Sequence, residues 1–167
     1  MRAAGVRPRD RQRQRRHVAL GHAWERRVSS AEHRRFLEAF LFAAQNGDLT
    51  ALKEIFAEDV VSITDGGGIT GAARIPVLGR ERVAKFIAGF PSRFWENTTL
   101  AWTQVNGQPS GLIMRGDTII ALATVDASPQ GIGQILWVMN PAKLAAIARS
   151  LKASSRHPKL EKPQSRK

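Results

Sequence analysis

The chain of 167 residues contains no cysteine and no tyrosine, and no histidine lies between residues 36 and 148. Without cysteine there are no disulfides, thiolate nucleophiles or cysteine-ligated metal sites. Without tyrosine no phenol can stabilise an oxyanion, and without a central histidine the core has neither a histidine base nor a histidine-rich metal site. No glycine-rich loop is followed by the helix that phosphate binding needs. We therefore expect no metal and no cofactor.

Long apolar runs are also absent. No run approaches the roughly 20 residues that a membrane helix needs, and the arginine-rich start has no apolar segment behind it, so it is not a secretory signal. The length and the 43% of apolar residues predict one domain with a single core. The lack of cysteine and of targeting signals leads us to expect a cytoplasmic protein.

The formal net charge of +12 is distributed unevenly. Residues 1–35 carry +8 and residues 149–167 carry +6, whereas the segment 36–148 carries −2. The predicted fold is therefore near neutral, and the basic residues are concentrated at the two ends. Basic ends bind polyanions through a salt-sensitive, sequence-independent attraction, so weak contact with nucleic acid is one expectation. Solvated ends without a partner are the alternative.

The first half of the chain has a helical pattern that two short strands and a glycine turn interrupt. Ser29 and Glu32 predict the start of a helix over 30–46, and Asp48 caps a second helix whose apolar face includes Leu52. A strand is expected over 58–64, followed by a glycine turn and a short strand over 69–75 that Pro76 ends. A third helix is expected over about 80–90.

The second half has the pattern of strands. Strands are expected over 100–105, 111–115, 118–126 and 132–139, the first two joined by a hairpin turn at Asn106-Gly107. A last helix begins with Pro at its first position. We divide the chain into a basic segment 1–28, a folded domain 29–151 and a disordered basic tail 152–167. The order of elements predicts an α+β fold in which helices cover one side of a curved antiparallel sheet.

Three residues are candidates for a pocket between sheet and helices. Asp126 would share a strand face with Leu122 and Thr124, and beside apolar walls its carboxylate could serve as a general base. The alternative, which we favour, is that Asp126 opens a solvent-exposed turn. Trp102 and Trp137 could line the same pocket or belong to the core, and for both the core is the favoured interpretation. Asp126 is thus the catalytic candidate, and the interpretation that we favour is that the chain is not an enzyme.

Two short motifs lie far apart in the sequence. One is the glycine turn Asp65-Gly66-Gly67-Gly68, and the other is Asn140-Pro141-Ala142-Lys143-Leu144 at the start of the last helix. A glycine-rich tip lets another chain approach the backbone closely, and a helix start presents free N–H groups. Each motif alone is equally well explained as a turn or a helix cap.

Six segments in order resemble the SnoaL-like C-terminal domain of extracytoplasmic-function RNA polymerase sigma factors, over about residues 29–151. The first two are "SSAEHRRFLEAF" at 29–40 and "GDLTALKEIFAEDV" at 47–60. The others are "DGGG" at 65–68, "PVLGRERVAKFI" at 76–87, "VNGQP" at 105–109 and "NPAKL" at 140–144. The resemblance implies the cone-shaped fold of nuclear transport factor 2 and SnoaL. It also implies a regulatory module that contacts the sigma core domains or RNA polymerase.

In that family the glycine hairpin and the Asn-Pro segment face the sigma core. The resemblance therefore implies a set of partner-binding residues here, namely Asp65, Gly66, Gly67, Gly68, Asn140, Pro141, Lys143 and Leu144. Ile69 departs from the family, which usually has a basic residue there. The promoter-opening and helix-turn-helix domains of a complete sigma factor are not in this chain, although "RQRQRRHV" at 11–18 resembles the end of a recognition helix. The alternative function is a stand-alone small-molecule-binding protein or enzyme of the isomerase or cyclase type, with a small apolar ligand in the cone.

Overall fold

The computed structural model describes residues 28–68 and 74–155. The predicted basic segment 1–28 falls outside this part except for Val28, as do Ile69 and the tail from residue 156 onward. Helix α6 (Pro141–Ser155) extends four residues past the expected domain end at 151. None of the helices in 28–68 and 74–155 is long and apolar enough to span a membrane.

Two capped helices open the described part of the chain. Helix α2 (Ser30–Gln45) starts at a capping box, in which the Ser29 hydroxyl accepts from the Glu32 N–H and the Glu32 carboxylate accepts from the Ser29 N–H. Asp48 caps α3 (Leu49–Ile55) through a 3.0 Å bond from the Ala51 N–H. Both starts agree with the prediction because capping depends on side chains within three residues of each other.

The six strands of the described residues form one curved sheet in the order β2-β1-β6-β5-β4-β3. Strand β1 (Phe56–Asp65) lies beside β6 (Gly131–Val138), and the pair is parallel. The expected α+β class and curved sheet are confirmed, but the sheet is mixed rather than wholly antiparallel. The remaining pairs are antiparallel and involve β2 (Val77–Leu78), β3 (Thr98–Val105), β4 (Gln108–Arg115) and β5 (Thr118–Ser128).

The strand expected over 69–75 was wrong where the structure describes it. Arg74 and Ile75 form a bend, and strand β2 begins after Pro76 instead of ending there. Proline lacks the N–H that a ladder requires, so pairing with β1 starts at Val77, opposite Ser62. The rest of the predicted strand, 69–73, lies outside the described residues.

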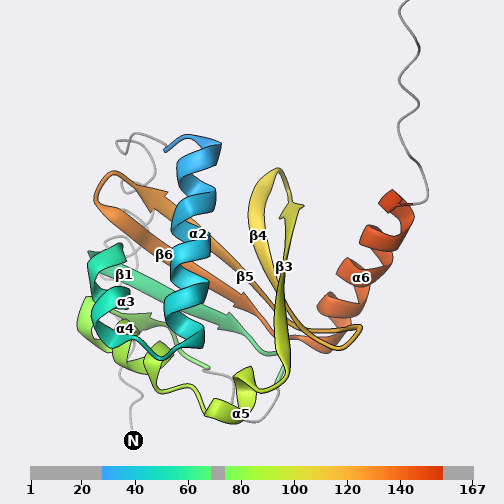
Figure 1. Ribbon diagram of the computed structural model, residues 1–167, viewed down its shortest axis with the longest axis horizontal. Coiled ribbons are helices and arrows are strands. Elements are labelled where there is room, and N and C mark those ends of the chain that lie inside the picture. The colour runs from blue at the N-terminus through green and yellow to red at the C-terminus, as the bar shows by residue number, and fades with distance from the viewer. Residues whose placement is uncertain (1–27, 69–73, 156–167) are drawn as a thin grey trace, which may run out of the picture.

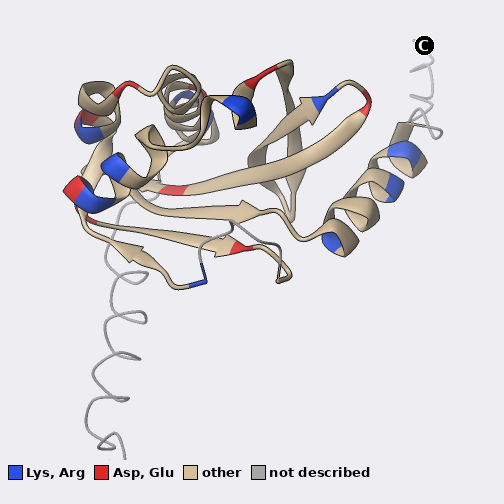
Figure 2. Cartoon of the chain, turned by 90° about the horizontal axis from the view of Figure 1, so that it is seen from below, with Lys and Arg blue, Asp and Glu red and all other residues tan. Residues whose placement is uncertain are grey.

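Helices α2, α3 and α4 (Arg80–Ala88) lie on one side of the sheet, as Figures 1 and 2 both show. They enclose the main core, in which Phe40, Ile87 and Trp137 are fully buried. A short helix that the sequence did not predict, α5 (Ser92–Trp95), closes one end of this core. Its aromatic residues pack around Phe90, which stacks on Trp95 and touches Trp137.

The expectation that the helices cover one side of the sheet was wrong for α6, which packs on the other face and forms a second, smaller core there. Helix α6 covers Leu112 and Leu122 there through Leu144, which is 6% exposed. A bulge interrupts the alternation of β5 nearby, because Ala121 and Ile119 pair with consecutive residues of β4 and Ile120 is left between them. Ile120 therefore packs with the main core, whereas Leu122 faces α6.

Candidate functional site

The two separated motifs meet at one place on the surface. The Lys143 ammonium donates a hydrogen bond to the Asp65 carboxylate, and the Met139 N–H donates to the Asp65 carbonyl at 2.8 Å. Asp65 ends β1 and Lys143 lies in the first turn of α6, so the parallel pairing of β1 with β6 brings them together. We name Asp65, Gly67, Asn140 and Lys143 the paired-motif site.

The contact between Gly67 and Asn140 requires glycine. Gly67 has φ of +58°, in the left-handed region, and a Cβ there would lie 2.7 Å from Asn140 Cγ. Asn140 in turn caps α6, because its Oδ1 accepts from the Ala142 N–H at 3.1 Å. A side chain at Gly67 would displace the residue that starts the last helix.

The Asp65 carboxylate is held in its charged form. The hydrogen bond from Lys143 lowers its pKa most, and desolvation is the next largest effect and raises the pKa. The Lys143 charge, the Asn140 amide and the Gly67 N–H each lower the pKa by less, and the net shift is downward. The Asp65 side chain is 29% exposed and that of Lys143 is 60% exposed. A partner can therefore reach both members of this ion pair.

The other predicted partner-binding residues lie at different depths. Gly68 and Pro141 are exposed beside the paired-motif site, whereas Gly66 is buried. Leu144 lies in the second core, so its side chain holds α6 against the sheet. The exposed part of the two motifs is thus the turn tip and the first turn of α6.

The three predicted pocket residues do not meet. Trp137 is fully buried and packs on Phe40, with ring centroids 5.6 Å apart. Asp126 is exposed and lies between Val125 and Ala127, which both face the main core, so its side chain points to the opposite face of the sheet. Trp102 lies on the edge strand β3, away from both.

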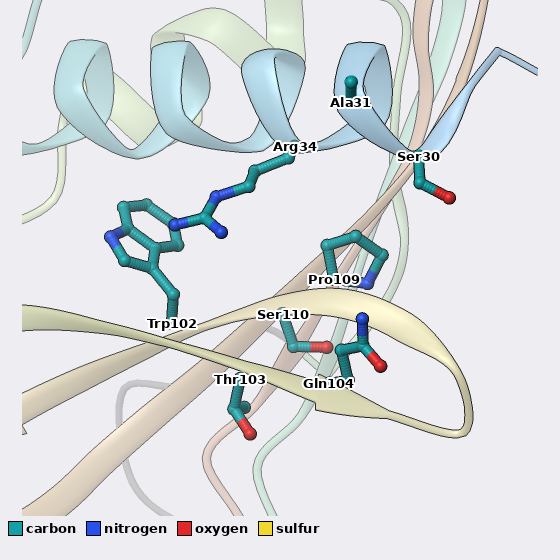
Figure 3. A pocket seen from close by; sticks show the side chains of 8 residues that line it. All are labelled: Ser30, Ala31, Arg34, Trp102, Thr103, Gln104, Pro109 and Ser110. Atoms are coloured by element: carbon teal, nitrogen blue, oxygen red, sulfur yellow. The ribbon is translucent and has the colours of Figure 1, made fainter. Parts of the chain in front are cut away.

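Trp102 lines a cleft between the start of α2 and the β3–β4 hairpin, with a volume of about 440 Å³ (Figure 3). The Arg34 guanidinium lies over the Trp102 ring, 6.0 Å from its centroid, and Arg34 Nε donates to Glu38 at 2.8 Å. We call this cavity the hairpin cleft. Its lining comes from both elements: Ser30, Ala31, Arg34, Trp102, Thr103, Gln104, Pro109 and Ser110.

The sequence did not indicate the hairpin cleft. Arg34 and Glu38 are recognisable as an i,i+4 pair, but nothing in the sequence places them over Trp102. A second unpredicted contact is His33, whose Nε2 lies 2.5 Å from the Val125 carbonyl oxygen. A nitrogen that close to a carbonyl must donate, so His33 fastens α2 to β5 rather than lying free on the surface.

Three buried polar atoms have no hydrogen-bond partner in the described part of the chain. They are the Ser62 hydroxyl and the indole nitrogens of Trp95 and Trp137. Buried polar atoms without a partner are uncommon in native proteins. Within 28–68 and 74–155, no three histidine, aspartate or glutamate side chains are grouped as metal ligands.

Comparison with known proteins bears on the fold. No protein-family model and no curated protein matches the sequence. Among solved structures, the chain is similar to the extracytoplasmic-function sigma factor SigJ of Mycobacterium tuberculosis, with a TM-score of 0.53 and 18% identity. The match covers 80% of this chain and 48% of SigJ, so the chain spans about half the length of that protein.

Two further structures have lower scores. A putative ketosteroid isomerase from Kribbella flavida has a TM-score of 0.46 and 12% identity, over 65% of this chain and 77% of that one. An NTF-2-like protein of unknown function from Burkholderia xenovorans has a TM-score of 0.46 and 14% identity, over 66% and 84%. The chain has the NTF2-like fold. At these identities the likeness shows the fold alone, and fold does not determine function.

Proposed function

We propose that this chain is a SnoaL-like regulatory module that modulates transcription initiation by docking on the core domains of a sigma factor or on RNA polymerase. The observation that carries the proposal is the paired-motif site. Two motifs that are 75 residues apart, from Asp65 to Asn140, form one exposed constellation. Such a constellation is more than two independent local turns, because each motif positions the other.

The chemistry of the site suits protein–protein contact. Its tip has exposed glycine backbone that a partner can approach closely, beside an exposed ion pair and a helix start. Helix α6 carries Lys143, Arg149 and Lys152 and no acidic residue (Figure 2). This face therefore favours a partner with acidic groups, which charge complementarity would steer into register. RNA polymerase acts in the bacterial cytoplasm, so the proposal includes that location.

The likeness to SigJ supports the proposal at the level of fold. SigJ is a sigma factor, and the match covers about half of it. Contact between this chain and a sigma core is tested by a binding measurement. We would measure binding of the chain to RNA polymerase from the source organism, and to its extracytoplasmic-function sigma factors, by biolayer interferometry at about 50 and 200 mM salt.

The decisive variant is Lys143→Glu, which reverses the charge of the paired-motif site. Its matched control is Lys53→Glu, because Lys53 forms a similar exposed ion pair with Glu81 at 2.8 Å. We expect Lys143→Glu to weaken binding about tenfold or more and Lys53→Glu less than twofold. Equal loss in both variants would reject docking at this site. Binding that vanishes at the higher salt for all variants would assign it to the basic ends, and no binding at all would reject the function.

A second candidate is a small-molecule-binding protein that uses the main core. The three unpartnered atoms at Ser62, Trp95 and Trp137 favour it. All three can donate a hydrogen bond, so the ligand they suit is apolar with an acceptor oxygen. The exposed Asp126 is on the other face of the sheet and supplies no base there.

The test is an NMR titration with 2-tetralone, a compact ketone, against tetralin, the same skeleton without the oxygen. If the core binds such a ligand, 2-tetralone should shift the indole N–H signals of Trp95 and Trp137 in a saturable way, and tetralin should shift them far less. Equal shifts from both compounds would mean that the polar atoms play no part. No shift would reject the candidate.

A further inference from the structure

The hairpin cleft is separate from both places discussed above. It opens at the sheet edge, because β3 is the terminal strand of the sheet. Towards the core, Leu41 packs directly on Gly111, where an added Cβ would lie 2.3 Å from Leu41 Cδ1. Leu41 is fully buried in the main core, and Gly111 pairs with Trp102 across the hairpin. The contact of α2 with β4 therefore stands between the cleft and the core.

The lining of the cleft combines one flat apolar surface with one positive charge. Trp102 is 37% exposed, so part of its indole ring is accessible to a ligand in the cleft. Among the described residues of the lining, Arg34 is the only charged side chain, and Figure 3 shows it extending from α2 over the indole. The rest of the lining is small or polar. The volume of about 440 Å³ lies within the range typical of small-molecule sites.

Arg34 retains donors for a ligand. Its Nε donates to Glu38, whereas its two terminal nitrogens donate to no residue in 28–68 or 74–155. A guanidinium has five N–H donors in a rigid fork, and two terminal nitrogens suit a carboxylate. The Arg34 guanidinium lies over the Trp102 ring at 6.0 Å from its centroid, near the outer limit of a cation–π contact, so the fork lies beside the apolar surface.

We propose that the hairpin cleft binds a small planar organic anion, with its carboxylate on Arg34 and its ring against Trp102. This inference is independent of the proposed regulatory role and of ligand binding in the main core. Glu38 competes with the ligand for Arg34, since its carboxylate already neutralises part of that charge. The proposal therefore makes an unusual prediction: removing the charge of Glu38 should strengthen binding rather than weaken it.

The experiment is an NMR titration of the full-length chain with 2-naphthoate, with the uncharged 2-naphthamide as the matched compound. The Trp102 indole signal is assigned by its loss in Trp102→Phe. The variants are Arg34→Met, which keeps an unbranched apolar stem but removes the guanidinium, and Glu38→Gln. The control is Arg35→Met, because Arg35 is exposed on the same helix and does not line the cleft.

We expect saturable shifts at Ser30, Ala31 and the Trp102 indole with 2-naphthoate. The uncharged 2-naphthamide should bind at least about tenfold more weakly than 2-naphthoate. Arg34→Met should weaken binding of 2-naphthoate about tenfold or more, since hydrogen bonds to charged groups are the strong ones. Arg35→Met should change it less than twofold, and Glu38→Gln should strengthen it. Unchanged backbone spectra of the free variants would show that each still folds.

Three outcomes would overturn the proposal. The first is no saturable shift at Ser30, Ala31 or Trp102. The second is an equal effect of Arg34→Met and Arg35→Met, which would reduce the interaction to general attraction by surface charge. The third is a shift centred on Trp95 and Trp137, which would place the ligand in the main core and support the second candidate function instead.

Discussion

Replacing Gly67 by alanine tests the contact between the two motifs directly. An L-residue at φ of +58° costs about 1–2 kcal/mol. In addition, the new Cβ would lie 2.7 Å from Asn140 Cγ, so the Asn140 side chain must leave. Losing its cap on α6 costs about 1 kcal/mol more. We therefore expect Gly67→Ala to lower the free energy of unfolding by about 2–3 kcal/mol.

Gly68 is the matched control for this substitution. Its φ is +84°, so alanine is strained there too, but an added Cβ meets no described atom within 4 Å. Gly68→Ala should therefore cost only the backbone strain of about 1–2 kcal/mol. The difference of about 1 kcal/mol between the two variants measures the displacement of Asn140, and it corresponds to roughly 4 °C in melting temperature for a domain of this size.

The assay is urea unfolding followed by circular dichroism, repeated in an Asn140→Ala background. Without the asparagine side chain, Gly67→Ala should cost no more than Gly68→Ala, because nothing is left to displace. If the two glycine variants differ by less than about 0.3 kcal/mol in the wild-type background, the packing of Asn140 on Gly67 does not exist in solution. The account of the paired-motif site would then fail.

Two further outcomes follow from single contacts. Gly111→Ala should destabilise the fold by about 1–2 kcal/mol in urea unfolding, because the buried Leu41 must move. The control is Gly133→Ala, because a Cβ added at Gly133 has no described atom within 4 Å. Equal destabilisation by the two variants would contradict the close approach of α2 to β4. Lys143→Met should move the pKa of Asp65 up towards its ordinary value in an NMR pH titration, since the hydrogen bond from Lys143 is the main cause of the lowering. Because the folded pKa of Asp65 is lowered, the ion pair stabilises the fold fully above the ordinary carboxyl pKa, and this stabilisation is lost as the pH falls through the lowered pKa. If the Asp65 titration is the same in Lys143→Met as in the wild type, Lys143 is not the cause of the lowered pKa.

Interactions within a few residues could be predicted from the sequence. The capping box at Ser29 and Glu32, the cap at Asp48 and the turn at Asn106-Gly107 all depend on neighbouring side chains and backbone preferences. The apolar periodicity indicated α2, α3, α4, α6 and most strands but not the short α5, and the order of the elements indicated the α+β class. The sequence also singled out both halves of the paired-motif site, although only through resemblance to a known family.

The sequence could not determine which distant segments pair. The parallel pairing of β1 with β6 joins strands about 75 residues apart, and that pairing alone puts Lys143 on Asp65. The bulge at Ile120 likewise depends on register against β4, and it changes which side chains of β5 face the core. Without that register, alternation along β5 would put Ile120 on the same face as Leu122, which the structure places on the opposite face.

Local chemistry thus determined the elements, and tertiary packing determined the sites. Turns and caps form between groups that are close together in the chain, so a short stretch of sequence is enough to predict them. The hairpin cleft needs Arg34 from a helix and Trp102 from an edge strand, brought together by the packing of Leu41 on Gly111. Such a contact depends on the shape of the whole core, and no segment of the sequence encodes it alone.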